Sequence, residues 1–348
     1  AIGIATAYNK FYILPEVYSV LPTSGTVGTI VTVNGTGYGA NDNITISFGT
    51  NAAIKYAAAD TRGWFSTTWT VDTQEYGTTT IAALGIATAY NRFYILPEVY
   101  SVLPTSGTIG TIVTVQGTGY AANDNITVSF GTNAAIQTAV ADTRGWFSTT
   151  WTVDTQMVGT TTITATGIAA ASNRFYILPE VVSVLPTSGT VGTIVTISGT
   201  GYGANDNVTV SFGTNAAIQT AVASVYGSFT AVFTVDTQAY GTTTIAASGA
   251  SVVASNIFNI LPEVYSVVPT LGTVGTIVTI QGTGYGANDN ITVSFGTNAA
   301  IQTAVASEYG SFTAVFMVDT QAYGTTTIAA LGIATASNRF YILPEVYS

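Results

Sequence analysis

The acidic side chains are the first candidates for chemistry, because this 348-residue chain contains no histidine and no cysteine. Those absences remove the commonest general base, the thiol nucleophiles and the usual ligands of transition metals. A hydrolase could still use paired carboxylates. Acidic residues recur at three places, which are Glu16, Glu98, Glu180 and Glu263, then Asp42, Asp124, Asp206 and Asp289, then Asp72, Asp154, Asp236 and Asp319. Each lies beside a turn or a proline, where carboxylates accept hydrogen bonds from backbone N–H groups. We therefore expect no catalytic residues and no enzyme.

Calcium is an alternative role for two of these acids, Glu98 and Asp124. Carboxylate and amide oxygens are the ligands that Ca²⁺ prefers, and the ion needs about six to eight of them. The density of carboxylates is low, however, and no Asp-x-Asp-x-Asp loop with a ligating glutamate occurs. A calcium ion here would stiffen a boundary between segments. We otherwise expect no cofactor.

Asparagine residues in Asn-x-Thr acceptor sequences are candidates for glycosylation. They stand at one equivalent place in each quarter of the chain, as Asn43, Asn125, Asn207 and Asn290, and Asn34 adds a further acceptor. The alternative is chance, because copying one segment multiplies one accidental acceptor. If they are used, the glycans project at regular intervals from a turn at the start of a strand.

Two tryptophan–arginine pairs are candidates for an interface or a sugar-stacking platform. The sequence Asp-Thr-Arg-Gly-Trp contains Arg62 and Trp64, and returns with Arg144 and Trp146, whereas the second half of the chain has Ser-x-Tyr-Gly-Ser there. In a strand, each tryptophan falls on the face opposite the inward phenylalanine that follows it, so it should be partly exposed. An exposed tryptophan beside an arginine suits protein or sugar contacts. The alternative is a tryptophan that lies flat across a neighbouring loop.

An internal period near 82 residues divides the chain into four repeats. The motif Ile-Leu-Pro-Glu-Val returns with its proline at Pro15, Pro97, Pro179, Pro262 and Pro344. The expected repeats are therefore 15–96, 97–178, 179–261 and 262–343, with 1–14 as the closing strands of a preceding repeat and 344–348 as the start of a following one. The third repeat has one extra residue between Thr244 and Ile260, for which a β-bulge is the simplest account.

The elements that position these residues are strands. In the second repeat, residues 112–115 are β-branched, 126–130 alternate between apolar and hydroxyl side chains, and 147–153 place aromatic residues on one face. Short segments of this kind, separated by turns and without a helical period, predict an all-β antiparallel sandwich.

The first half of every repeat resembles the IPT/TIG domain. The resemblance rests on residues 15–33, on Gly35-Thr36-Gly37-Tyr38 and on residues 44–49. The second half, with its Gly-Trp-Phe or Gly-Ser-Phe hairpin, looks more like the repeats of long prokaryotic surface proteins. The resemblance implies a tandem array of immunoglobulin-like β-sandwiches, used as spacers or binding modules in exported proteins, and no catalytic residues.

Charge and hydropathy limit the partners. The chain has 7 basic and 17 acidic residues and a net charge of −10, which argues against nucleic acid and anionic membranes. No apolar run reaches the length of a membrane span, so we expect no membrane insertion in this segment. A charged fraction of 7 % with 47 % hydrophobic residues indicates a chain that folds.

A structural role therefore leads the hypotheses. Near-identical repeats present near-identical faces, which suits a homopolymer such as an extracellular filament, sheath or stalk at the cell surface. The alternatives are an adhesin that binds surface carbohydrate through Trp64 and Trp146, and a passive spacer for a functional tip elsewhere.

Overall fold

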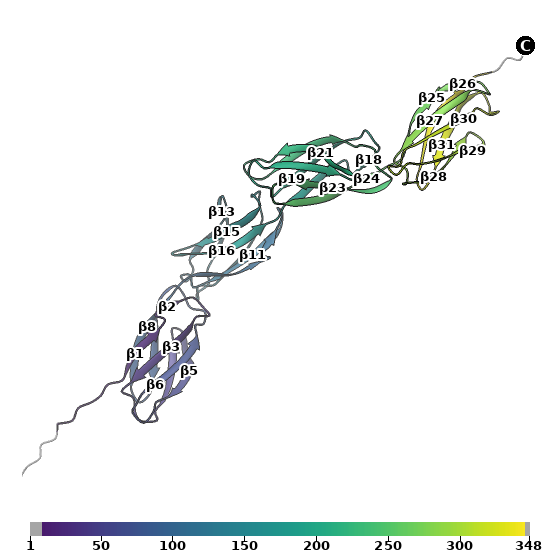
Figure 1. Cartoon of the computed structure of the whole chain (residues 1–348). Coiled ribbons are helices and arrows are strands. Elements are labelled where there is room, and N and C mark those ends of the chain that lie inside the picture. Colours follow the sequence, from purple (N-terminus) through teal and green to yellow (C-terminus); the bar gives the residue numbers. More distant parts are fainter. Residues whose placement is uncertain (1–8, 345–348) are drawn as a thin grey trace, which may run out of the picture. The chain divides into compact units, whose positions relative to one another are not determined.

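The computed structural model describes residues 9–344, and in that range the chain consists of strands and connecting turns, without helices (Figure 1). No segment of this range is therefore a helix long and apolar enough to cross a membrane. Contacts divide the chain into two compact units. The first runs to Val153 and includes Thr160–Tyr176, and the second comprises Asp154–Gly159 and continues from Ile177. The first unit thus holds most of the first two repeats, and the second holds the other two.

Each repeat contains the same succession of strands. In the first repeat they are β1 (Glu16–Leu21), β2 (Ser24–Gly25), β3 (Ile30–Thr36), β4 (Asn43–Phe48), β5 (Asn51–Ala58), β6 (Phe65–Thr70), β7 (Gly77–Leu84) and β8 (Thr88–Ile95). In the second they are β9 (Glu98–Leu103), β10 (Ser106–Gly107), β11 (Ile112–Thr118), β12 (Asn125–Phe130), β13 (Asn133–Val140), β14 (Phe147–Thr152), β15 (Gly159–Thr166) and β16 (Ala170–Ile177).

The second unit continues the series. The third repeat has β17 (Glu180–Leu185), β18 (Ser188–Gly189), β19 (Ile194–Thr200), β20 (Asn207–Phe212), β21 (Asn215–Val222), β22 (Phe229–Thr234), β23 (Gly241–Ser248) and β24 (Val253–Ile260). The fourth has β25 (Glu263–Val268), β26 (Leu271–Gly272), β27 (Ile277–Thr283), β28 (Asn290–Phe295), β29 (Asn298–Val305), β30 (Phe312–Met317), β31 (Gly324–Leu331) and β32 (Thr335–Ile342).

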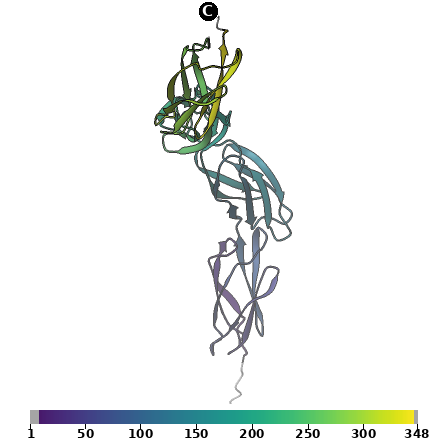
Figure 2. The same cartoon turned by 90° about the vertical axis from the view of Figure 1, so that its right-hand side faces the viewer.

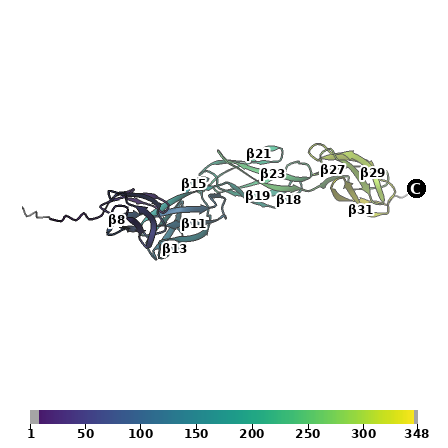
Figure 3. The same ribbon diagram turned by 90° about the horizontal axis from the view of Figure 1, so that it is seen from below.

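These strands form two facing sheets in every repeat, so the predicted β-sandwich is confirmed. In the first repeat a three-stranded sheet has the order β1-β3-β6, and a five-stranded sheet has the order β2-β8-β7-β4-β5. All pairs are antiparallel except the short β2–β8 pair. Figures 2 and 3 show from two other sides that strands alone build each repeat.

The core lies between the two sheets of each repeat and follows the alternation of the strands. On β4, Ile44, Ile46 and Phe48 are buried, while the residues between them face outward. The Phe48 ring centroid lies 5.7 Å from that of Trp69 and 5.8 Å from that of Phe93. Each repeat therefore has an aromatic centre of its own and does not depend on a neighbour for its core.

Side-chain amides close the two seams between the sheets. Asn173 on β16 donates to the Val99 carbonyl of β9 at 2.8 Å, and Gln137 on β13 donates to the Thr150 carbonyl of β14 at 2.9 Å. We call these groups the seam amides. The asparagine bond recurs as Asn91–Val17, Asn256–Val181 and Asn338–Val264, and the glutamine bond as Gln219–Val232 and Gln302–Val315. Lys55 stands at the glutamine position of the first repeat.

The extra residue of the third repeat lies in a hairpin loop, so the expected β-bulge is wrong. Strands β23 and β24 pair without a register shift, from Gly241 opposite Ile260 to Ser248 opposite Val253. Their loop, 249–252, is one residue longer than the corresponding loop 85–87 of the first repeat. A surface loop absorbs an insertion without disturbing the backbone hydrogen bonds of the ladder.

The segment before the first repeat differs from the closing strands expected there. Residues 9–14 form no strand, and Phe11 is exposed, whereas Phe93 at the equivalent place of the first repeat is buried. A single extended segment without neighbouring strands leaves its backbone groups unpaired by a sheet. Residues 1–8 and 345–348 of the two expected terminal fragments lie outside the described residues.

Candidate functional site

A carboxylate fixes the turn that presents each exposed tryptophan. The Asp60 Oδ1 atom accepts hydrogen bonds from the backbone N–H groups of Arg62 at 2.8 Å and Trp64 at 2.9 Å. These two N–H groups hold the pKa of Asp60 below its ordinary value. In the third repeat the Ser224 hydroxyl accepts from the Tyr226 backbone N–H at 3.2 Å instead. The same turn thus occurs with an aspartate in the first repeat and with a serine in the third, and the tryptophan is present only in the aspartate form.

A tyrosine on the first strand of the repeat contacts each of these tryptophans. Trp64 is 53 % exposed, and its ring lies edge-on to Tyr18 with centroids 5.8 Å apart. Trp146 is 37 % exposed, and its Nε1–H donates to the Tyr100 hydroxyl at 3.0 Å. That hydroxyl donates in turn to Gln116 Oε1 at 3.1 Å. Both tryptophans are therefore partly exposed, as the strand pattern predicts.

A backbone hydrogen bond joins the first repeat to the second and the third to the fourth. The Tyr76 N–H of the first repeat donates to the Tyr120 carbonyl of the second at 2.8 Å, and Tyr240 donates to the Tyr285 carbonyl at 2.9 Å in the second unit. The Tyr120 ring is buried, and its hydroxyl donates to the Ala165 carbonyl at 3.1 Å. Burial raises the pKa of Tyr120 above its ordinary value. The loop of the preceding repeat therefore bonds to a buried residue of the following repeat.

Beside this contact lies a cavity that we call the junction groove. Val27, Gly28 and Thr73 of the first repeat line one side, and Glu98, Tyr100, Thr118 and Trp146 of the second repeat line the other, around a volume of about 290 Å³. The second unit has a corresponding groove of about 310 Å³, lined by Val191, Thr237, Glu263, Tyr265 and Thr283. Ser311 takes the place of the tryptophan there.

An unpaired hydroxyl lies at both grooves, and also at the equivalent Thr200 of the third repeat, which lines neither of them. Thr118 lies directly opposite Glu98 in the β9–β11 ladder, is 3 % exposed, and its Oγ1 atom has no hydrogen-bond partner. Thr283 of the second unit is 7 % exposed and likewise has no partner for its Oγ1 atom. A buried hydroxyl without a partner costs free energy, so these two atoms call for a water or a ligand group.

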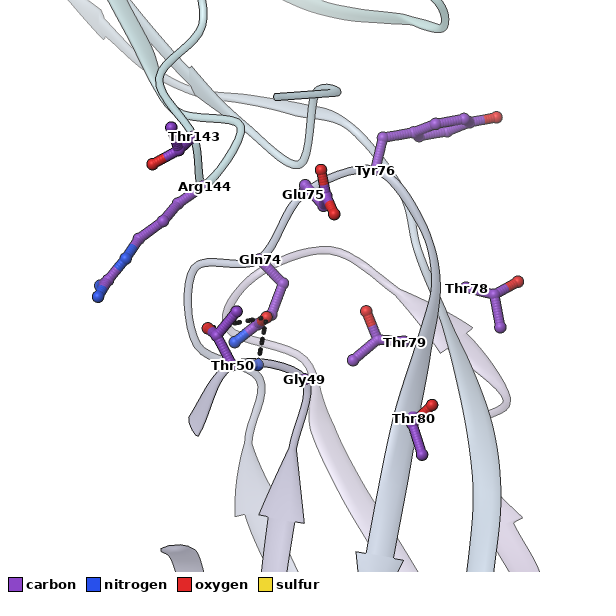
Figure 4. A pocket seen from close by; sticks show the side chains of 10 residues that line it. All are labelled: Gly49, Thr50, Gln74, Glu75, Tyr76, Thr78, Thr79, Thr80, Thr143 and Arg144. Carbon is purple, nitrogen blue, oxygen red and sulfur yellow. Dashed lines mark hydrogen bonds between the residues drawn. The ribbon is translucent and has the colours of Figure 1, made fainter. Parts of the chain in front are cut away.

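Arg144 lies in a different groove from Trp146, although sequence analysis grouped the two. Thr143 and Arg144 enter that polar groove from the second repeat, and Thr50, Gln74 and Glu75 belong to its first-repeat side (Figure 4). Gln74 Oε1 accepts hydrogen bonds from the Thr50 backbone N–H at 3.3 Å and from its hydroxyl at 3.4 Å. The tryptophan and the arginine of the second repeat thus serve separate surfaces.

The asparagines of the recurrent acceptor sequences are exposed. Asn43, Asn125, Asn207 and Asn290 are the first residues of β4, β12, β20 and β28. Each follows an aspartate whose carboxylate pins a distant loop, as Asp42 Oδ2 does by accepting from the Ile86 N–H at 2.8 Å. Asn34 is half-buried within β3. The four equivalent side chains are accessible to a modifying enzyme, and their use stays a prediction.

The two calcium candidates do not form part of a metal cluster. Asp124 Oδ2 accepts from the Ile168 N–H at 2.7 Å, and Glu98 lines the junction groove. Among residues 9–344, no group of three or more acidic side chains lies close enough to hold a metal ion. Calcium at Glu98 or Asp124 stays a prediction, in which backbone carbonyls and water would supply most of the ligands.

Sequence analysis missed Thr118, Tyr100 and Tyr120, which shape the junction. A signal was present for two of them, because Gly-Thr-Gly-Tyr returns in every repeat with Thr118 and Tyr120 as members. The spacing could not reveal that a loop of the preceding repeat would cover this motif.

Comparison of the sequence with protein families decides the assignment of these repeats. The model of the IPT/TIG domain matches residues 15–74, 179–257 and 262–332, which together make up more than half of the chain. The chain belongs to the IPT/TIG domain family. The matched IPT/TIG segments lie in the first, third and fourth repeats, and the second repeat has the same strands. No protein of curated function matches the sequence.

Several solved structures resemble the IPT/TIG array at low identity. Invasin, a bacterial integrin-binding protein, is 14 % identical with a TM-score of 0.23, covering 93 % of this chain and 78 % of invasin. A Ca²⁺-stabilized ice-binding adhesin of an Antarctic bacterium is 12 % identical with a TM-score of 0.18, covering 94 % and 99 %. The BSP domain of a biofilm associated protein is 10 % identical with a TM-score of 0.19, covering 100 % and 99 %. These scores assign no function.

Proposed function

We propose that this chain is a structural subunit of an extracellular filament, sheath or stalk, built by end-to-end and lateral packing of its IPT/TIG repeats and carrying glycans. The observation that supports this most is the recurrent tyrosine contact between repeats. The bond from Tyr76 to Tyr120 in the first unit returns from Tyr240 to Tyr285 in the second. A contact that joins successive copies in the same way can extend an array without a new interface.

Exposed apolar pairs on the three-stranded sheets support lateral packing. In the first repeat, Leu21 is opposite Thr32, and Ile30 lies two residues from Thr32, so both apolar side chains lie on the same face as diagonal neighbours. All members of the set are exposed, and the pairs are Leu21–Ile30, Leu103–Ile112, Leu185–Ile194 and Val268–Ile277. Few charges must be desolvated when such a surface is covered, because only 7 % of the residues are charged.

Electron microscopy of the purified protein tests this proposal. We expect regular filaments or sheets, and dispersed single chains alone at high concentration would contradict it. Replacing the four leucine or valine members of the pairs by asparagine should abolish lateral assembly while leaving the fold intact. The matched control is Ile168→Asn, because Ile168 is similarly exposed but lies in a hairpin loop. Assembly that survives the fourfold variant would rule out this face as the contact.

Mass spectrometry of the native protein tests the glycan part separately. Added hexose-containing mass is expected on peptides with Asn43, Asn125, Asn207 and Asn290, which are all exposed. Unmodified peptides at all four places would remove glycosylation from the proposal without affecting the filament.

An adhesin that binds carbohydrate is the second candidate function. The observation in its favour is that Trp146 lines the junction groove together with Tyr100 and Glu98. Aromatic faces and a carboxylate are groups that bind sugar rings and their hydroxyls. Binding of the purified chain to immobilised neutral oligosaccharides tests it, and the absence of any binding would contradict it.

A further inference from the structure

We infer that the junction groove between the first and second repeats holds one pyranose ring of a neutral saccharide. In this site the ring lies against Trp146 and Tyr100, and its hydroxyl groups bond to Thr118 and Glu98. The inference rests on the second candidate function and is independent of the filament. It assigns carbohydrate binding to this one groove and not to every exposed tryptophan.

The aromatic wall is the first argument. The position of Trp146 is fixed by its Nε1–H, which donates to the Tyr100 hydroxyl, and that hydroxyl itself donates to Gln116. Both rings line the groove, so the wall is ordered before a ligand arrives. A pre-ordered wall binds more tightly, because no side-chain freedom is lost on binding. The C–H face of a pyranose is the apolar surface that such a wall accommodates.

The unpaired hydroxyl is the second argument. Thr118 lines the groove while its Oγ1 atom is buried and lacks any partner. A hydroxyl both donates and accepts, and a sugar hydroxyl does the same, so one ligand group satisfies Thr118 in either sense once the side chain turns its enclosed Oγ1 atom toward the groove. Satisfying a buried polar atom recovers the free energy that its burial costs.

Charge selects the class of ligand. Glu98 is the one acidic residue among the seven that line the groove, and no basic residue lines it. A phosphate, sulfate or uronic acid would therefore meet a carboxylate without a compensating cation, which disfavours anions. A single carboxylate supplies too few ligands for calcium. With anions and calcium disfavoured, the groove favours a neutral ligand that donates hydrogen bonds. Sugar hydroxyls are such donors and bond well to a carboxylate.

The size of the groove limits the ligand to a short one. Its volume of about 290 Å³ lies at the small end of the range for ligand pockets. One ring fits that volume with its neighbours in solvent, so a terminal sugar or one unit of a chain binds there.

The chain provides two matched comparisons for this site. In the second unit Glu263, Tyr265 and Thr283 line the corresponding groove, but Ser311 replaces the tryptophan. In the first repeat Trp64 lies beside Tyr18 and is not among the residues that line the junction groove. One comparison thus lacks the ring, and the other has a ring outside the groove.

The experiment measures binding of the whole chain to immobilised neutral oligosaccharides that end in glucose, galactose or mannose, followed by titration with the free sugar. Trp146→Ala should weaken binding about tenfold or more, in line with the contribution of a stacked aromatic ring. Trp64→Ala should leave the affinity within about twofold. Ser311→Trp should raise the number of sites per chain from one to two.

Thr118→Val separates binding from folding. Because the Thr118 hydroxyl has no partner, its replacement by a methyl group should leave the melting temperature unchanged or raise it. Affinity for the sugar should nevertheless fall. An affinity that stays unchanged in both Trp146→Ala and Thr118→Val would overturn the groove assignment while the carbohydrate-binding function stands. Failure of the unsubstituted chain to bind any of the probes would overturn both.

Discussion

At the scale of single residues, the repeats differ in which aromatic residue fills one position of the core. Trp69 and Trp151 lie in the cores of the first two repeats, and their indole N–H groups are buried without a partner. Phe233 and Phe316 occupy the same place in the other two repeats, where no donor has to be satisfied. The phenylalanine version loses some packing volume and avoids an unpaired polar group, so the two effects oppose each other.

This opposition predicts a small effect for Trp151→Phe. We expect the free energy of unfolding to change by less than about 1.5 kcal/mol, because the lost packing volume and the removal of the unpaired N–H group oppose each other. Trp151→Ala should cost about 3 to 5 kcal/mol, because it leaves a cavity without any compensating gain beyond the lost N–H. Urea unfolding followed by circular dichroism measures both. A loss in Trp151→Phe as large as that in Trp151→Ala would contradict the prediction, because removing the unpaired N–H group would then offset none of the lost packing.

At the scale of the strands, the seam amides protect the sheet edges without using charge. Gln137 Oε1 accepts from the outward N–H of Thr138 at 3.0 Å, while its Nε2 donates to the Thr150 carbonyl. One side chain thus satisfies a donor and an acceptor on two edge strands that would otherwise be open to another chain. Lys55 cannot accept a hydrogen bond, so the edge of the first repeat has no such closure.

Lys55→Gln should therefore add a closure that the first repeat lacks. We expect it to stabilise that repeat by about 0.5 to 1.5 kcal/mol, the usual net value of a hydrogen bond. Hydrogen exchange measured by mass spectrometry should show slower exchange at Tyr56, the residue equivalent to Thr138.

The reverse change, Gln219→Ala in the third repeat, is the matched control for this prediction. It removes the bonds from Gln219 to Val232 and Thr220, so exchange at Thr220 should accelerate. Unchanged exchange in both variants would mean that the glutamine bonds do not form in solution.

The strands were predictable from the sequence, and the seams between them were not. Alternation at Ile44, Ile46 and Phe48 announces a half-buried strand, because one face of a sheet must be apolar. The bond from Asn173 to Val99 joins residues 74 positions apart, and no local pattern encodes such a pairing. The junction groove was missed for the same reason, since it forms only where two repeats meet. The wrong prediction of a β-bulge shows that the repeat period reveals an extra residue but not where in the structure that residue lies.

At the scale of the whole molecule, one buried tyrosine per repeat makes the stability sensitive to alkali. Burial raises the pKa of Tyr38, Tyr202 and Tyr285 to about 12, and that of Tyr120 also lies above its ordinary value. The folded repeat holds this proton more tightly than the unfolded chain does. Stability is therefore complete below the unfolded pKa of 10.0 and decreases as the pH rises toward 12.

This predicts a stability that falls above pH 10 with a slope of about 1.4 kcal/mol per pH unit for each tyrosine. Thermal unfolding measured between pH 7 and pH 12 follows it. Tyr202→Phe should flatten the slope for the third repeat and leave the other repeats as they are. A melting temperature that stays constant to pH 12 would contradict the buried state of these phenols.

The seam amides also make each repeat sensitive to slow hydrolysis of its side-chain amides. Asparagine and glutamine are thermolabile, because their amides hydrolyse slowly to carboxylates. Hydrolysis of Asn173 would remove the N–H that binds the Val99 carbonyl and place a negative charge against an oxygen. The first strand of that repeat would then lose its tie to the opposite sheet. Since every repeat has its own core, such damage would accumulate repeat by repeat, beginning at the amides that hydrolyse fastest.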